Sequence, residues 1–379
     1  MVINYLKQRF KKPQNDLRYR SLWQYIHIDI ILVLCLALLF ITGLSILYSA
    51  SNQSLNTIEK QALHVGFAFI VMITVAQIPP ATLQRWAPFI YIVSISLLIA
   101  VLVIGHISKG AQRWLTIGFL RFQPAELLKL AIPMFLAWYY HRIHLPISTK
   151  TALISLPIIL IPVIITAKQP DLGTAIVLLI AGSSVLFLAG LSWRLISLLG
   201  GILILCLPLV WWIMYDYQRQ RVLTFFSPDR DPLGKGYHII QSKIAIGSGG
   251  LFGKGWLNGT QSHLHFLPEH TTDFIFAVCG EEFGFIGCII LLFLYTLVIA
   301  RGWYITLYAQ DTFSRLLAGS ITLSFFVAFF VNMGMVTGIL PVVGLPLPFI
   351  SYGGSSVMML MVGFGILMSI QTHKKLMTT

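Results

Sequence analysis

The sequence predicts an all-α polytopic membrane protein with about ten transmembrane helices and a large structured extracytoplasmic loop between helices 7 and 8. Of its 379 residues, 57% are hydrophobic and only 10% are charged, and the mean hydropathy is +0.82. Soluble domains are about 45–50% apolar and about 25% charged. The apolar residues also gather in stretches of about 20, the length that crosses a bilayer as a helix. Lipid, rather than water, is therefore expected to surround most of the chain.

The same composition excludes disordered chains, disulfide-stapled secreted scaffolds and coiled coils as main interpretations. The net charge of +13 is high enough for a nucleic-acid-binding protein. Six basic residues, however, crowd the start of the chain ahead of the first apolar stretch: Lys7, Arg9, Lys11, Lys12, Arg18 and Arg20. This pattern predicts an anchor beside anionic lipid headgroups and no nucleic-acid partner.

Ten apolar stretches are long enough to span the membrane. They lie at about 28–50, 62–79, 87–106, 124–140, 151–167, 172–190, 194–214, 274–300, 315–338 and 353–370. The expected organisation is a basic cytoplasmic tail at 1–27, a ten-helix domain at 28–370 whose large loop covers about 215–273, and a cytoplasmic tail at 371–379. No cleavable signal peptide is expected, because the first apolar stretch begins late and is long enough to span by itself.

The short connections on one side of the predicted membrane are basic. They carry Arg85, Arg142 with Lys150, Arg194, Arg301 with Arg315, and Lys374 with Lys375. Since basic short loops stay in the cytoplasm, the sequence predicts a multi-pass protein with both termini cytoplasmic and its chemistry facing outward. Four basic residues fall in short loops on the opposite side, which suggests retention for an anionic ligand: Lys109, Arg113, Arg121 and Lys168.

Two loop motifs leave alternatives open. The glycine-rich stretch 247–259 has no Ser or Thr after Gly-Lys and no dinucleotide fingerprint, so it is either a tight extracellular turn or a backbone contribution to a diphosphate site. A cluster of metal-ligand types follows: His263, His265, Glu269 and His270. Its spacing is not that of a helical zinc site and Pro268 interrupts any helix, so solvated loop residues are the favoured interpretation.

Ionisable residues at membrane depth are expensive in lipid and mark cavities or partners. Glu126 and Lys129 stand three apart at the start of the fourth span, hence on one helix face, where they form either an ion pair or part of a site. Asp171 starts the sixth span, where it caps the helix or binds a ligand.

Asp273 stands at the head of the eighth span, beside basic loops. A half-buried carboxylate in this position is placed to act as a base at the bilayer surface. Glu281 and Glu282 follow on the same helix, and a role in helix packing or in lining the cavity is favoured over that of a second catalytic acid.

Several stretches together resemble the SEDS (shape, elongation, division and sporulation) family of bacterial cell-wall polymerases. They are KGAQRW (109–114), RFQPAE (121–126), QPDLGT (169–174), DPLGKGYHIIQSKIAIGSGGLFGKGWLNGTQ (231–261), FLPEHTTDFIF (266–276) and GILPVVGLPLPFISYGGSS (338–356). They cover most of the chain and fall in the outward loops and helix ends. The histidine at 265 and the preceding GTQ favour the elongation branch over the division branch.

The resemblance implies a ten-helix SEDS fold and a peptidoglycan glycosyltransferase that uses lipid II during elongation. It places the protein in the bacterial inner membrane with its active site facing the periplasm. It also implies a class B penicillin-binding protein as partner, with other elongation-complex membrane proteins. The family's essential aspartate falls at Asp273. We predict that the remaining site residues bind substrate: Lys109, Arg113, Glu126, Lys129, Asp171, Glu269 and Ser351.

As a mechanistic hypothesis, Asp273 takes the proton from the acceptor sugar hydroxyl, while Lys109, Arg113 and Lys129 stabilise the departing diphosphate. No cofactor is certain, and a divalent cation (Mg²⁺ or Mn²⁺) bound by Asp273 stays open. Two other functions are alternatives, a lipid II flippase and a scaffold that only activates the transpeptidase. Charges clustered near the outer helix ends count against transport, which usually needs polar groups through the midplane.

Overall fold

The structure, a computed structural model, describes residues 27–108, 111–117, 120–169, 171–214, 216–226, 237–264, 266 and 269–374. The expectations for most of the two tails, and for Lys109 and His265, therefore lie outside the described residues.

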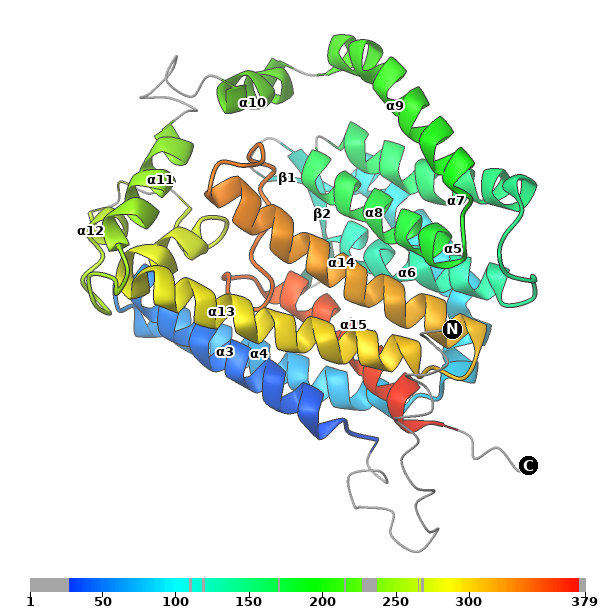
Figure 1. Ribbon diagram of the computed structural model, residues 1–379, viewed down its shortest axis with the longest axis horizontal. Helices are drawn as coiled ribbons and strands as arrows, with labels where there is room; N and C mark the ends of the chain where they lie inside the picture. Colours follow the sequence, from blue (N-terminus) through cyan, green and yellow to red (C-terminus); the bar gives the residue numbers. More distant parts are fainter. Residues whose placement is uncertain are drawn as a thin grey trace, which may run out of the picture.

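Each of the ten predicted apolar stretches forms a helix. Nine of these helices run back and forth as one bundle, whereas α9 extends away from the others (Figure 1). The ten helices are α3 (Ile30–Ala50), α4 (Leu55–Ala76), α5 (Pro80–Ile104), α6 (Pro124–Tyr140), α7 (Thr149–Lys168), α8 (Leu172–Leu188), α9 (Trp193–Ile213), α13 (Ile275–Leu307), α14 (Thr312–Val336) and α15 (Gly354–Thr372). Seven helices of the described chain are long and apolar enough to cross a membrane: α3, α4, α5, α7, α13, α14 and α15. The chain is therefore a multi-pass membrane protein.

Smaller elements occupy the connections on one end of the bundle. Three antiparallel strands join α5 to α6 in the order β1-β2-β3, namely β1 (His106–Ser108), β2 (Ala111–Ile117) and β3 (Leu120–Phe122). The all-α expectation did not include them. Their short sequences carry little apolar alternation, and the pairing of their backbone groups is a tertiary outcome. Three further helices lie in the predicted large loop: α10 (Asp216–Phe226), α11 (Tyr237–Gly249) and α12 (Thr260–His263).

Both described ends of the chain meet at the opposite end of the bundle. Asp29 caps α3 by accepting from the Leu32 amide at 3.2 Å, and its carboxylate pairs with Arg301 of α13 at 2.7 Å. Nearby, the rings of His27 and His373 stack at 3.7 Å. An even number of crossings between the start of α3 and the end of α15 accounts for this arrangement.

Helix α13 is longer than the predicted span and is interrupted. Gly284 has φ 64° and ψ −161°, a conformation that is essentially restricted to glycine. The break divides α13 into two parts. We refer to residues 275–283, which follow Asp273, as the outer part and to the longer stretch 285–307 as the inner part. The α11–α12 connection packs at this break, where the Phe285 amide donates to the Gly250 carbonyl at 2.9 Å.

Candidate functional site

The connection from α14 to α15, residues 338–353, is the centre of the candidate site. It packs against the turn that precedes α13. Ser351 Oγ donates to the Thr272 carbonyl at 2.5 Å and accepts from the Leu347 amide at 2.8 Å, and the Tyr352 amide donates to the Thr271 carbonyl at 3.0 Å. Ser351 is buried. We refer to residues 338–353 as the crossing segment.

Asp273 lies where the crossing segment meets the head of α13. Asn332 of α14 is fully buried, and its Nδ2 donates to the Asp273 carbonyl at 2.9 Å and to the Leu345 carbonyl at 2.6 Å. One amide thus ties the backbone of Asp273 to the crossing segment, while the Asp273 side chain stays partly exposed. Sequence reasoning missed Asn332, although an amide near the end of an otherwise apolar helix is a signal that could have found it.

The Asp273 carboxylate faces Gly344 of the crossing segment. Gly344 has φ +78°, and a Cβ at this position would lie 3.3 Å from Asp273 Oδ2. We expect Gly344→Ala to lower turnover about tenfold, because the left-handed backbone is strained by about 1–2 kcal/mol with a side chain and the added methyl displaces the carboxylate. The measurement is the steady-state turnover rate of purified, folded Gly344→Ala compared with that of wild type. Gly66→Ala, where a Cβ would meet nothing within 4 Å, is the control, and equal loss in both variants would contradict the expectation.

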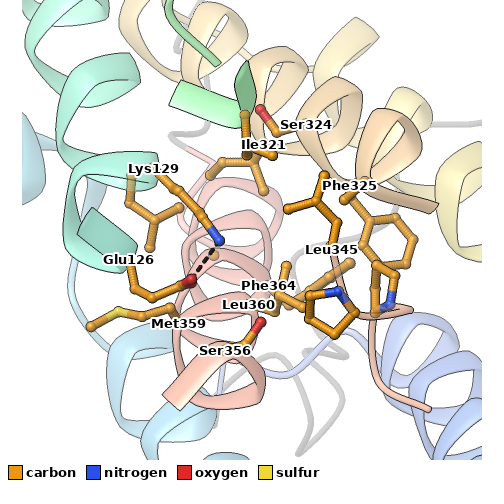
Figure 2. Close-up of a pocket in the computed structure, with 16 residues that line it drawn as sticks. Glu126, Lys129, Ile321, Ser324, Phe325, Leu345, Ser356, Met359, Leu360 and Phe364 are labelled. Carbon is orange, nitrogen blue, oxygen red and sulfur yellow. Dashed lines mark hydrogen bonds and ion pairs between the residues drawn. The ribbon is translucent and has the colours of Figure 1, made fainter. Parts of the chain in front are cut away.

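Glu126 and Lys129 line a pocket beside the crossing segment. Pro124 begins α6, which places both side chains in its first turns on one face, and Lys129 Nζ lies 2.6 Å from Glu126 Oε1. The pair points into a space of about 710 Å³ that is partly open to the outside (Figure 2). The rest of the lining is mostly apolar and comes from α6, α8, α14, α15 and the crossing segment, including Leu130, Val177, Ile321, Phe325, Leu345, Pro346, Leu360 and Phe364.

Arg113 and Asp171 form a second charged pair. Arg113 Nε on β2 lies 3.6 Å from Asp171 Oδ2, and Gln123 Nε2 donates to the same oxygen at 3.0 Å. Asp171 also caps α8, because its Oδ1 accepts from the Thr174 amide at 3.2 Å. The predicted helix cap is therefore present, and the second carboxylate oxygen of Asp171 contacts Arg113 and Gln123.

The crossing segment brings these groups together. A Cβ on Gly173, at the start of α8, would lie 2.9 Å from the Val343 carbonyl, so the helix capped by Asp171 abuts the residue next to Gly344. Leu345, the neighbour on the other side, lines the Glu126–Lys129 pocket. Asp273 and both charged pairs are thus arranged around residues 343–345 of the crossing segment.

The other predicted residues take different places. Glu269 is exposed in the turn ahead of Asp273, with φ +52°, and its Oε2 accepts from Thr272 Oγ1 at 3.0 Å. The contacts of Ser351 are with backbone groups, so it holds the crossing segment against this turn.

The described residues do not form a ready-made metal site. They contain no group of three or more His, Cys, Asp or Glu side chains placed to hold an ion. A divalent cation at Asp273 would need oxygen ligands from elsewhere, such as substrate phosphates. Two amides of the glycine-rich loop are also occupied by α13, since Lys254 N donates to the Glu281 carbonyl and Gly255 N to the Glu282 carbonyl, both at 3.0 Å. These contacts favour a tight turn over a diphosphate cradle.

Comparison with known proteins covers nearly the whole chain. A model of the FtsW/RodA/SpoVE family, described as cell cycle protein, matches residues 24–376. Peptidoglycan glycosyltransferase MrdB of Escherichia coli K12 is 51% identical over 95% of this chain and 97% of its own length. The probable peptidoglycan glycosyltransferase FtsW of Trichlorobacter lovleyi is 36% identical over 92% and 94%.

Solved structures agree. A chain from a peptidoglycan synthase complex that coordinates polymerization and crosslinking superposes with a TM-score of 0.77 at 35% identity, covering 90% of this chain and 97% of that one. The rod shape determining protein RodA of Thermus thermophilus gives a TM-score of 0.69 at 30% identity, covering 96% and 100%. From these similarities and the bundle described above, the chain belongs to the FtsW/RodA/SpoVE family and is a multi-pass membrane glycosyltransferase.

Proposed function

We propose that this peptidoglycan glycosyltransferase polymerises lipid II, a disaccharide-peptide carried on undecaprenyl diphosphate, into glycan strands for cell elongation, with Asp273 as its general base. One observation carries the assignment. The Asp273 carboxylate stands at a helix head, its backbone is held by Asn332 and its side chain faces Gly344. A partly exposed carboxylate on a braced backbone is suited to accept a proton from a bound hydroxyl.

In the proposed step, Asp273 accepts the proton of the acceptor sugar 4-hydroxyl while the oxygen of that hydroxyl attacks the anomeric carbon of the donor sugar. The bond between that carbon and the diphosphate breaks, and undecaprenyl diphosphate leaves with the electron pair. General-base catalysis contributes typically about 10²–10⁴-fold. Cations aimed at the leaving group contribute about 3–4 kcal/mol each when well placed.

The charged pairs are proposed to bind the diphosphate. Lys129 lies at the charged side of a pocket whose remaining walls are mainly apolar, a combination that suits a phosphate joined to a hydrocarbon chain. Glu126 and Asp171 hold Lys129 and Arg113 in place through their ion pairs. Lys109 is proposed to add charge, and Glu269 and Ser351 to shape the turn around Asp273. No cofactor is assigned a step.

We place residues 27 and 373 on the cytoplasmic side, as the basic connections indicate, and the crossing segment on the periplasmic side. The domain limits at 1–27, 28–370 and 371–379, with the loop at about 215–273, are retained as part of this proposal. A class B penicillin-binding protein is the proposed partner. The similarity to a chain of a synthase complex that combines polymerization with crosslinking supports it.

Reconstitution tests the function directly. Purified protein, with and without its penicillin-binding partner, is incubated in liposomes with labelled lipid II, and glycan strands are resolved by size. We expect strands that need this protein and lengthen with time. Transbilayer movement of lipid II without strands, where another polymerase works on the same substrate, would favour the flippase. If the protein supports neither transbilayer movement of lipid II nor strand formation, the scaffold function would be favoured.

A further inference from the structure

The glycine-rich loop between α11 and α12 is built into helix α13. A Cβ on Gly249 would lie 2.0 Å from the Gly280 carbonyl oxygen, and one on Gly253 would lie 2.1 Å from that of Glu282. The Ile286 amide, just after the break at Gly284, donates to the Leu251 carbonyl at 3.2 Å. Loop and helix therefore approach so closely that only glycine fits at these contacts.

Glu281 is the centre of the contact. Its side chain is 0% exposed, and its Oε1 lies 2.7 Å from Lys254 Nζ. The same oxygen accepts from the Thr260 amide at 2.9 Å and from the Thr260 hydroxyl at 3.0 Å, and Oε2 accepts from the Gln261 amide at 3.2 Å. We refer to Glu281 with Lys254, Thr260 and Gln261 as the loop anchor.

A second contact fixes the loop to the first span. Trp256 Nε1 donates to the Ser45 carbonyl of α3 at 3.1 Å. The Ser49 hydroxyl, one turn further along α3, donates to Glu282 Oε1. The outer end of α3, the loop and the outer part of α13 thus form one hydrogen-bonded unit.

The break at Gly284 links this hydrogen-bonded unit to the position of Asp273. Between Gly284 and Asp273 lies only the short outer part of α13. The helix is kinked at Gly284, and the Phe285 and Ile286 amides after the kink donate to loop carbonyls. The position of the outer part depends on its own contacts, which include the apolar packing of residues 275–279 in the core, the loop anchor near the break, and Asn332 with Ser351 at the head. Asp273 precedes Glu281 by eight residues, about 12 Å along a helix.

We infer that Glu281 is a positioning residue, which holds the outer part of α13 through the loop anchor so that Asp273 stays in its working place. This inference rests on the proposed function of Asp273. Glu281 itself is 0% exposed, so it acts through the groups that it contacts. The Glu281 carboxylate is paired with the Lys254 ammonium. Removing the ammonium alone leaves a buried carboxylate without its cation, and removing the carboxylate charge alone leaves the ammonium without its anion. Removing both charges leaves neither group unpaired.

A charge-pair cycle tests this. Lys254→Met, Glu281→Gln and the double variant are purified, and kcat and KM for lipid II are measured per folded molecule. We expect each single variant to lower kcat about tenfold with KM within about twofold, and the double variant to recover most of kcat. Glu59→Gln, which removes an exposed carboxylate from α4, is expected to match wild type.

Hydrogen exchange at Lys254, Gly255, Thr260 and Gln261 provides a second readout that does not depend on activity. We expect faster exchange in both single variants and slower exchange again in the double variant. Wild-type kcat in all three variants, or exchange unchanged in Lys254→Met, would overturn the inference. If Asp273→Asn is inactive in the same assay while wild type is active, the proposed function stands whatever the Glu281 variants show. If wild type itself is inactive, the proposed function is overturned, and the hydrogen-exchange readout still tests the loop anchor.

Discussion

Asp273→Asn is expected to lower the rate of glycan polymerisation by about 10²–10⁴-fold. Asparagine keeps the size of the side chain and the backbone bond from Asn332 Nδ2 to the carbonyl of residue 273. It cannot accept the hydroxyl proton. Because the hydrogen bonds that hold this backbone are unchanged, the variant should fold and extract from membranes as wild type does.

Strand formation from labelled lipid II measures the effect, and thermal unfolding of the detergent-solubilised proteins is the control. Asn332→Ala provides a contrast, because it removes the brace of Asp273 and leaves the carboxylate. We expect partial activity with reduced stability there. Strands from Asp273→Asn at the wild-type rate would remove this residue from the mechanism.

Lys129→Met is expected to give the second largest effect. It removes the ammonium that lies 2.6 Å from Glu126, so the leaving diphosphate loses a cation and turnover falls by about 10²–10³-fold. It also leaves the Glu126 carboxylate, which is 7% exposed, without its partner. Breaking a largely buried pair costs about 3–5 kcal/mol, so a lower unfolding temperature is expected as well.

The double variant Glu126→Gln/Lys129→Met separates these two effects. With both charges removed, no unpaired carboxylate remains in the pocket, and most of the stability should return. The cation is still missing, so polymerisation should stay low. If the double variant regained wild-type turnover, the pair would have only the structural role that the sequence left open, and Lys129 would not bind the diphosphate.

Hydropathy was sufficient to predict the bundle because each crossing is a local property of its sequence. The helix that starts at Pro124 shows this, since its proline and its i,i+3 pair of Glu126 and Lys129 were readable from the chain, and the structure places both in one pocket. The strand meander around Arg113 was not readable, because its short strands are defined by one another rather than by their own composition.

The sequence by itself determined the membrane class, the ten helices, the meeting of the two described ends at one end of the bundle, and the charged residues Arg113, Glu126, Lys129 and Asp171 that the structure places around the crossing segment. Local signals suffice for these, namely apolar length, loop charge and residues that begin helices. Only the tertiary structure decided that Asp273 faces Gly344, that Asn332 braces its backbone and that Glu281 accepts from a loop more than twenty residues earlier. Those contacts join segments that are distant in the chain, and no local pattern encodes which buried polar group satisfies which.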